Sequence, residues 1–246
     1  MELISVVIPF YKKKNFIKKA IESILNQTYS NIEIILIYDD KDKEDLIYLN
    51  DNFGSNQKVK IIVNNRNIGA GLSRNRGIQI SNGKYICFLD ADDLWHKEKI
   101  SKQIAFMKKF NYKISHTSYE IVDDYNNLKS LRRAKDFSSY KDILKSCDIG
   151  LSTVIIEKDV ISDELKFVSL KTKEDFVLWL LILKSGIKIG GLDELLVSWR
   201  KTKNSLSSSV LQKLIDGYRV YRNYMKYNPI KSLYLLICLS INYLKK

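Results

Sequence analysis

Residues 83–93 read GKYICFLDADD, an apolar run that opens after a glycine and ends in three carboxylates. The apolar part is short and rich in β-branched and aromatic residues, so it predicts a buried strand. Runs of the same kind occur upstream, at residues 3–8, 32–38 and 59–63. Segments with apolar residues at helical spacing separate them. Strands that alternate with helices predict βαβ units, and therefore an α/β fold with a mostly parallel, Rossmann-like central sheet.

The second half of the chain is less regular. The same patterns predict helices at 97–110 and 174–184, strands at 113–122, 153–157, 187–192 and 195–199, and a serine-rich loop at 205–209. We find no internal repeat, so we expect one domain followed by a tail.

Composition excludes several classes of protein. The chain has 246 residues, a net charge of +13 and three cysteines that are far apart in the sequence. This cysteine pattern argues against a disulfide framework and a zinc site, and favours a reducing compartment. The longest apolar stretch, residues 233–239, is too short to span a bilayer, so we expect a cytosolic protein. The excess of positive charge predicts an anionic partner.

Ligands of parallel α/β sheets bind at the carboxyl ends of the strands, and carboxylates gather there in this sequence. Asp90, Asp92 and Asp93 directly follow one strand, and carboxylate oxygens suit Mg²⁺ or Mn²⁺. The alternative is a helix start, with Asp93 as the N-cap. Asp39 and Asp40 follow another strand and could accept the N3–H of a uracil ring or form an ordinary charged turn.

Two further segments have polar residues where chemistry is expected. Residues 65–77 combine glycine, asparagine and arginine at a loop-to-helix transition, which favours phosphate binding, but they lack the dinucleotide and P-loop glycine patterns. Glu174 and Asp175 precede an apolar helix and could supply a catalytic base or cap the helix.

Several motifs occur in a fixed order along residues 3–210. They are VVIPFY at 6–11, DD at 39–40, RNIG at 66–69 with SRNRG at 73–77, GKYICFLDADD at 83–93, KEDFVLWL at 173–180, and SWR at 198–200 followed by Ser205 and Ser207. Together they resemble family 2 glycosyltransferases, especially those that build bacterial surface polysaccharides. The resemblance implies an A-type glycosyltransferase fold over residues 1–210, with a nucleotide-binding half (1–95) and an acceptor-side half (96–210).

The resemblance also implies roles for individual residues. Pro9 and Tyr11 would shape the uridine pocket, and Asp39 would bind the uracil. Arg74, Asp90 and Arg200 would contact the donor. Asp92 would ligate Mn²⁺ or Mg²⁺, and Asp175 would be the catalytic base. The chain departs from the family pattern at Lys12, where asparagine is usual, and at Lys41 and Asp42, where glycine and serine are common. The second departure bears on which nucleobase the donor carries.

The activity implied by the resemblance is an inverting, metal-dependent transfer of a sugar from a nucleotide sugar, expected to be a UDP-sugar, to a lipid-linked bacterial glycan. Two other functions stay open at this stage: a nucleic-acid-binding protein, suggested by the charge and 15 tyrosines, and an inactive assembly partner. We expect no nucleic-acid partner, because the carboxylates lie where the sheet places its ligand.

The tail, residues 211–246, carries seven basic residues against Asp216 alone. Basic residues beside tyrosines and a short apolar helix predict adsorption to anionic lipid, and therefore a peripheral location on the inner face of the bacterial plasma membrane. The alternative is a closing helix packed on the core or in a homodimer.

Overall fold

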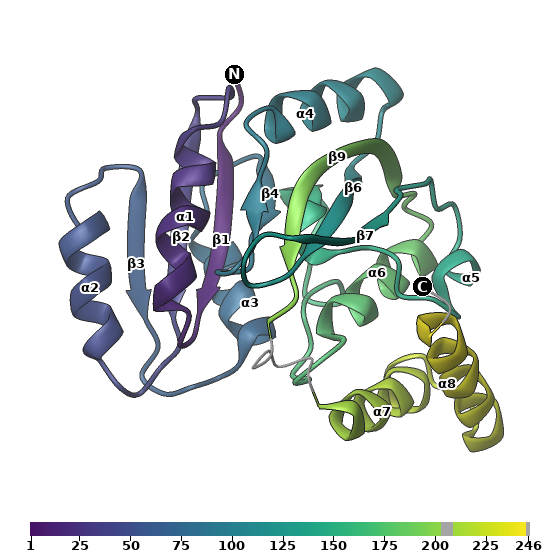
Figure 1. Cartoon of the computed structure of the whole chain (residues 1–246). Helices are drawn as coiled ribbons and strands as arrows, with labels where there is room; N and C mark the ends of the chain where they lie inside the picture. The colour runs from purple at the N-terminus through teal and green to yellow at the C-terminus, as the bar shows by residue number, and fades with distance from the viewer. Residues whose placement is uncertain (203–208, 245–246) are drawn as a thin grey trace.

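Four parallel strands from the start of the chain form one half of a nine-stranded sheet in the computed structural model, which describes residues 1–202 and 209–244 (Figure 1). They lie in the order β3-β2-β1-β4. Their bounds are β1 (Ile4–Phe10), β2 (Ile32–Tyr38), β3 (Val59–Val63) and β4 (Tyr85–Phe88). The predicted βαβ arrangement is confirmed here, and the carboxyl ends of these strands meet at one edge.

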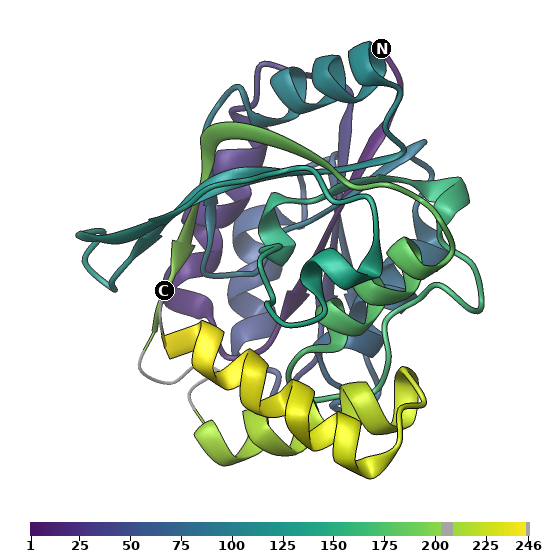
Figure 2. The ribbon, with the colours of Figure 1, turned by 90° about the vertical axis from the view of Figure 1, so that its right-hand side faces the viewer.

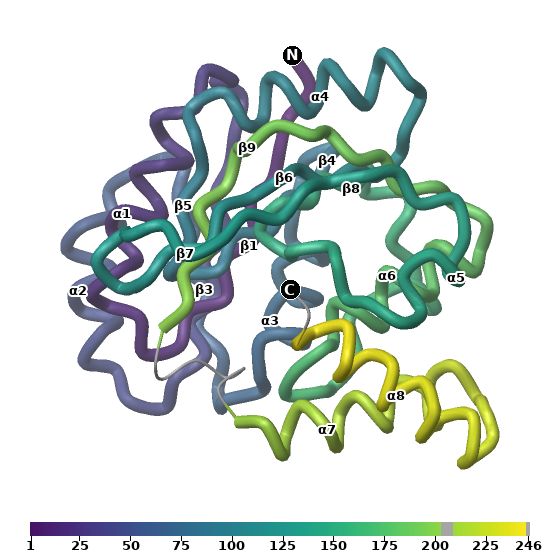
Figure 3. The backbone as a smooth tube through the Cα atoms, turned by 45° about the vertical axis from the view of Figure 1, so that its right-hand side comes forward, coloured from purple at the N-terminus to yellow at the C-terminus, as the bar shows by residue number. Residues whose placement is uncertain are grey.

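The second half of the sheet is mixed. Its strands are β5 (Leu94–Trp95), β6 (Ile114–Val122), β7 (Leu128–Arg132), β8 (Ile155–Glu157) and β9 (Gly190–Arg200). β8 is antiparallel to both β4 and β6, whereas β9 runs parallel to β6. Figure 3 shows β9 following β6 along this half of the sheet. The expectation of a mostly parallel sheet therefore holds for the first four strands, whereas the remaining strands join through antiparallel pairs and the parallel β6–β9 pair.

Two local predictions are wrong. The strands expected at 187–192 and 195–199 form one strand, β9, whose pairing with β6 is irregular between Thr117 and Tyr119. The alternative in which Asp93 caps a helix is also wrong, because β5 lies between Asp93 and the helix expected at 97–110 and pairs with β9.

Helices cover both faces of the sheet. They are α1 (Lys14–Leu25), α2 (Glu44–Phe53), α3 (Ala70–Ile80), α4 (Lys99–Phe110), α5 (Tyr140–Ile143) and α6 (Glu174–Lys184), with 3₁₀ turns at Leu151–Thr153 and Lys158–Val160. Residues of α1, α2 and α4 pack in one apolar core, and residues of α3 and α6 pack in a second. Successive residues of β1 enter opposite cores, since side chains alternate along a strand.

The tail forms two helices joined by a π-helical turn. They are α7 (Val210–Arg219), the turn Val220–Tyr224, and α8 (Pro229–Leu244), and they lie side by side in Figure 2. Tyr221, Leu235 and Leu239 are buried in the same core as α6, and the Tyr221 hydroxyl donates a hydrogen bond to the carbonyl of Leu144. The tail is therefore helical, as predicted, and its inner face is packed on the domain. Within residues 1–202 and 209–244, no helix has the length and apolar character needed to cross a membrane.

Candidate active site

The loop after β3 is built around the carboxylate of Asp39, at the end of β2. Asp39 is 2% exposed. Its Oδ1 accepts hydrogen bonds from Asn64 Nδ2 at 2.7 Å and from the backbone N–H of Ile68 at 2.8 Å, and its Oδ2 accepts one from the N–H of Gly69 at 2.8 Å. Gly69 has a φ of 86°, which glycine adopts without strain. Asp39 thus organises the loop. Its Oδ2 accepts one hydrogen bond and can accept another, so uracil binding by Asp39 remains a prediction.

An exposed aromatic and a small polar hollow lie beside this loop. Tyr11 directly follows β1 and is 41% exposed. Pro9, within β1, is half-buried. Lys12 has a left-handed backbone and its Nζ lies 5.4 Å from the centroid of the Tyr11 ring. A cavity of about 200 Å³ is lined by Lys12, Tyr38, Asp40, Asp42, Glu44 and Asp45. The predicted uridine residues are thus at the expected edge of the sheet.

Arg74 on α3 connects the turn after β4 to the start of α6. Its guanidinium is 3% exposed, with Nη2 2.7 Å from Asp90 Oδ1 and Nη1 2.7 Å from Glu174 Oε1. It also lies over the Phe167 ring, 5.5 Å from its centroid. A planar guanidinium suits two carboxylates at once. The structure therefore brings the predicted residues Arg74 and Asp90 together with the start of α6.

Glu174 and Asp175 are adjacent but have different partners. Glu174 is buried against Arg74, and burial raises the pKa of its carboxyl to about 7, although Arg74 opposes the rise. Asp175 is more exposed, and its Oδ1 accepts a hydrogen bond from the backbone N–H of Phe176 at 2.7 Å. Burial also raises the pKa of Asp175, whereas Arg74 lowers it. Glu174 is engaged in an ion pair with Arg74, and the role of Asp175 as the base remains a prediction.

Asp92 is held by a cation from the loop after β1. Lys13 Nζ lies 2.7 Å from Asp92 Oδ2 and also donates a hydrogen bond to Thr202 Oγ1 at 3.0 Å. Burial raises the pKa of Asp92, and the neighbouring ammonium opposes that rise. The sequence does not indicate this contact, because no spacing pattern links the lysines at 12–14 to Asp92.

Asp93 is a buried residue that supports the Asp90–Asp92 turn through hydrogen bonds. It is 1% exposed, its Oδ2 accepts a hydrogen bond from the Ser152 hydroxyl at 2.6 Å, and its Oδ1 accepts one from the N–H of Arg200 at 2.8 Å. Burial and the neighbouring carboxylates raise its pKa well above the usual range. Asp93 is thus a buried support for the Asp90–Asp92 turn, which corrects the helix-cap interpretation.

Arg200 braces the carboxylate turn. It is 5% exposed, and its guanidinium donates hydrogen bonds to the carbonyls of Asp92 at 3.0 Å and Asp123 at 2.8 Å, and to Asn126 Oδ1 at 2.7 Å. This network joins the Asp90–Asp93 turn to the β6–β7 hairpin. Contact of Arg200 with the donor remains a prediction, and the predicted residues Ser205 and Ser207 lie outside the described residues.

The fit of a divalent cation rests on Asp92. In the described part of the chain, no three His, Cys, Asp or Glu side chains form a complete metal cluster. An ion at Asp92 would therefore take its remaining ligands from water and from the oxygens of a diphosphate, which are the hard donors that Mg²⁺ prefers. The Lys13 ammonium shows that positive charge is accommodated at this carboxylate. Asp92 is a hard oxygen donor of the kind that such an ion takes, and dependence on a metal remains a prediction.

The fold and this site define an α/β domain of the A-type glycosyltransferase class. Solved structures agree on the fold: Staphylococcus aureus TarS 1–349 in complex with UDP-GlcNAc superimposes with a TM-score of 0.72 at 17% identity, over 99% of this chain and 73% of that one. The profile of the family described as "Glycosyl transferase family 2" matches residues 5–156. The chain belongs to this family and is a glycosyltransferase.

Full-length relatives carry specific names. The chain is 35% identical to the Escherichia coli UDP-Glc:alpha-D-GlcNAc-diphosphoundecaprenol beta-1,3-glucosyltransferase WfaP, over 97% of this chain and 92% of WfaP. It is 31% identical to WfgD, an E. coli protein with the same activity in its name, over 99% of this chain and 94% of WfgD.

Proposed function

We propose that this glycosyltransferase moves a sugar, with inversion, from a UDP-sugar to a hydroxyl of a lipid-linked glycan in the synthesis of a bacterial surface polysaccharide. The names of WfaP and WfgD support the lipid-diphosphate acceptor, and the UDP-GlcNAc complex of TarS supports the donor class. The observation that carries the proposal is the Asp90–Arg74–Glu174 bridge, which sets the predicted base beside the predicted donor site.

The side chains divide the chemistry between them. Tyr11 and Asp39 hold the uridine, and Asp90 and Asp92 face the donor diphosphate. A divalent cation at Asp92, when bound, supplies positive charge that stabilises the leaving diphosphate. Asp175 accepts the proton of the attacking acceptor hydroxyl, and a single displacement inverts the anomeric centre.

A thermal-shift panel tests the donor assignment. UDP should raise the unfolding temperature of the wild-type protein, and more so with Mn²⁺, because a ligand that binds the native state stabilises it. Asp92→Asn should lose the Mn²⁺-dependent part and keep the rest. A lack of preference for any of the uridine, guanosine, cytidine and adenosine diphosphates would contradict the nucleotide-sugar site, whereas preference for GDP would contradict only the uracil assignment.

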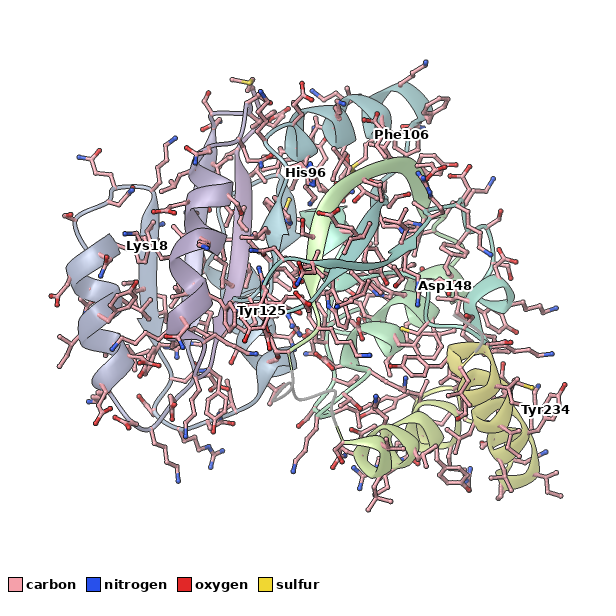
Figure 4. The ribbon with its side chains drawn as sticks, in the orientation of Figure 1. Lys18, His96, Phe106, Tyr125, Asp148 and Tyr234 are labelled. Atoms are coloured by element: carbon pink, nitrogen blue, oxygen red, sulfur yellow. The ribbon has the colours of Figure 1, made fainter. Side chains whose placement is uncertain are left out.

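We also propose that the tail holds the enzyme against anionic lipid on the inner face of the plasma membrane. The outer face of α8 exposes Ile230, Leu233, Tyr234, Ile237 and Ile241. Tyr234, labelled in Figure 4, is 55% exposed, and its ring centroid lies 5.4 Å from the Nζ of Lys145. The tail has a net charge of +6, which attracts a negatively charged lipid surface. The exposed apolar side chains of α8 suit burial in that surface.

A further inference from the structure

A buried carboxylate joins the tail to the loop before α6. Asp216 on α7 is 0% exposed, although it is the only acidic residue of the tail. Its Oδ2 accepts hydrogen bonds from the backbone N–H and the hydroxyl of Thr172, both at 3.1 Å. The same oxygen accepts one from Gln212 Nε2 at 2.9 Å, and Oδ1 accepts one from Arg219 Nη1 at 3.3 Å. A buried carboxylate costs free energy unless such partners compensate for lost water, and this one is fully partnered.

The loop that Asp216 holds leads directly to the proposed base. Thr172 lies three residues before Asp175, and between them Lys173 adopts a φ of 63°. This left-handed conformation is unfavourable for a residue with a side chain and persists only where its surroundings hold it. The carbonyl of Lys173 accepts the N–H of Val177, the first hydrogen bond that leads into α6. The position of Asp175 therefore depends on how Thr172 and Lys173 are fixed.

We infer that Asp216 is a positioning residue for Asp175, which makes α7 part of the catalytic apparatus. The inference rests on the proposed function, in which Asp175 is the base. Arg74 fixes the start of α6 from the α3 side through Glu174, and Asp216 fixes it from the tail side through Thr172. A base that is displaced by about 1 Å can lose on the order of 10²-fold in rate. Loss of Asp216 should therefore act on the transfer step and leave donor binding intact.

The experiment compares sugar transfer with donor hydrolysis by full-length Asp216→Ala, using UDP-glucose, Mn²⁺ and an α-GlcNAc-diphospholipid acceptor. Water is small and reaches a displaced base more easily than one particular acceptor hydroxyl does. We expect kcat for transfer to fall by about 10-fold or more, with the KM for donor and the UDP thermal shift unchanged, so the ratio of transfer to hydrolysis falls. Asp216→Asn keeps an acceptor oxygen for Thr172 and should recover part of that ratio.

Ser209→Ala is the matched control. Ser209 caps α7 by accepting a hydrogen bond from the N–H of Gln212, so its loss weakens α7 without removing a contact to Thr172. This variant should keep the wild-type ratio. If Asp216→Ala lowers transfer and hydrolysis equally, in step with its folded fraction, the inference is overturned.

If Asp216→Ala does not fold, Thr172→Val takes its place, because it removes one of the two bonds and keeps the shape of the side chain. A ratio in Thr172→Val equal to that of the wild-type protein would then overturn the inference. A wild-type protein that neither binds UDP nor hydrolyses a UDP-sugar would instead contradict the proposed function.

Discussion

Two adjacent carboxylates at the start of α6 differ in partner, and the difference predicts how their variants behave. Asp175→Asn keeps the shape of the side chain and removes its basicity, so transfer should fall by about 10²-fold or more. UDP should still raise the unfolding temperature of this variant, because the donor site is built from other residues. Glycosyl transfer and thermal shift, measured on the same preparation, check both parts.

Glu174→Gln is the matched control for that substitution. Glutamine still offers Arg74 an acceptor oxygen, so we expect a loss of transfer smaller than that of Asp175→Asn. Activity retained by Asp175→Asn and abolished in Glu174→Gln would show that the base is Glu174.

His116 predicts a pH dependence of stability. It is 1% exposed, its Nε2 lies 2.9 Å from the carbonyl of Lys135, and its ring stacks on Phe137. Burial lowers the pKa of His116 from 6.5 to about 4. The unfolded chain therefore takes up a proton as the pH falls through 6.5 while the folded protein does not, so stability is lost between pH 6.5 and 4.

Urea unfolding at pH 7 and pH 5 measures this contribution. His116 should account for a loss of about 2 kcal/mol in the free energy of unfolding over this interval. His116→Gln, which cannot titrate there, should lose correspondingly less than the wild-type protein. An equal loss in both proteins would contradict the assignment to His116.

At the scale of elements, the close approach of α3 to α6 depends on Gly71. A Cβ added there would lie 2.8 Å from the carbonyl oxygen of Val168 and 3.1 Å from Glu174 Cγ. Gly71→Ala should therefore lower the free energy of unfolding by about 1–3 kcal/mol, as overpacking does. Because the same shift would move Arg74, the UDP-induced thermal shift should also weaken. Wild-type stability and UDP response in this variant would show that the two helices are not held at this distance.

The local sequence pattern predicted the bounds of some strands and helices well and missed others, for a physical reason. β2, β3 and α6 have the predicted bounds, because each is a mostly apolar run with polar flanks, interrupted in the two strands only by Glu33 and Lys60. β5 has two residues and exists only because it pairs with β9. The pairing partner lies about a hundred residues away, and no pattern in residues 94–95 indicates it. The mixed second half of the sheet depends on the same kind of distant contact, as in the pairing of β6 with β9.

The same limit applies to the site. The resemblance to the family identified Asp39, Asp90, Asp92 and Asp175, and the first three lie where the sheet predicts. Lys13, Ser152 and Asp216 were not identified as partners, because a single lysine, serine or aspartate has no periodic or spacing signal. Their contacts join segments that are far apart in the sequence, and only the fold brings them together.

At the scale of the whole molecule, the outer face of the tail should bind anionic lipid. The double substitution Leu233→Ser with Ile237→Ser removes two exposed apolar side chains of α8 and leaves the buried Leu235 and Leu239 in place. Binding to phosphatidylglycerol vesicles should weaken several-fold by loss of apolar area, and binding of the wild-type protein should fall with salt. Co-sedimentation measures both.

Ile47→Ser on α2 is the control, since Ile47 is also exposed but lies outside the tail. Unchanged vesicle binding in the α8 variant, together with a loss of dimers in solution, would assign this face to a second copy of the chain. The deletion of α8 is not a clean test, because Leu235 and Leu239 are part of the core.

Time-resolved proton NMR of donor hydrolysis can test both inversion at the anomeric centre of a UDP-sugar and the role of Asp175 as the base. The purified protein is mixed with α-linked UDP-glucose or UDP-GlcNAc, Mn²⁺ and no acceptor, and the first sugar released by slow hydrolysis is observed before it mutarotates. Inverting hydrolysis releases UDP together with the β-anomer, and Asp175→Asn should release on the order of 10²-fold less of both. The α-anomer as first product, or equal hydrolysis by Asp175→Asn, would contradict the proposed mechanism.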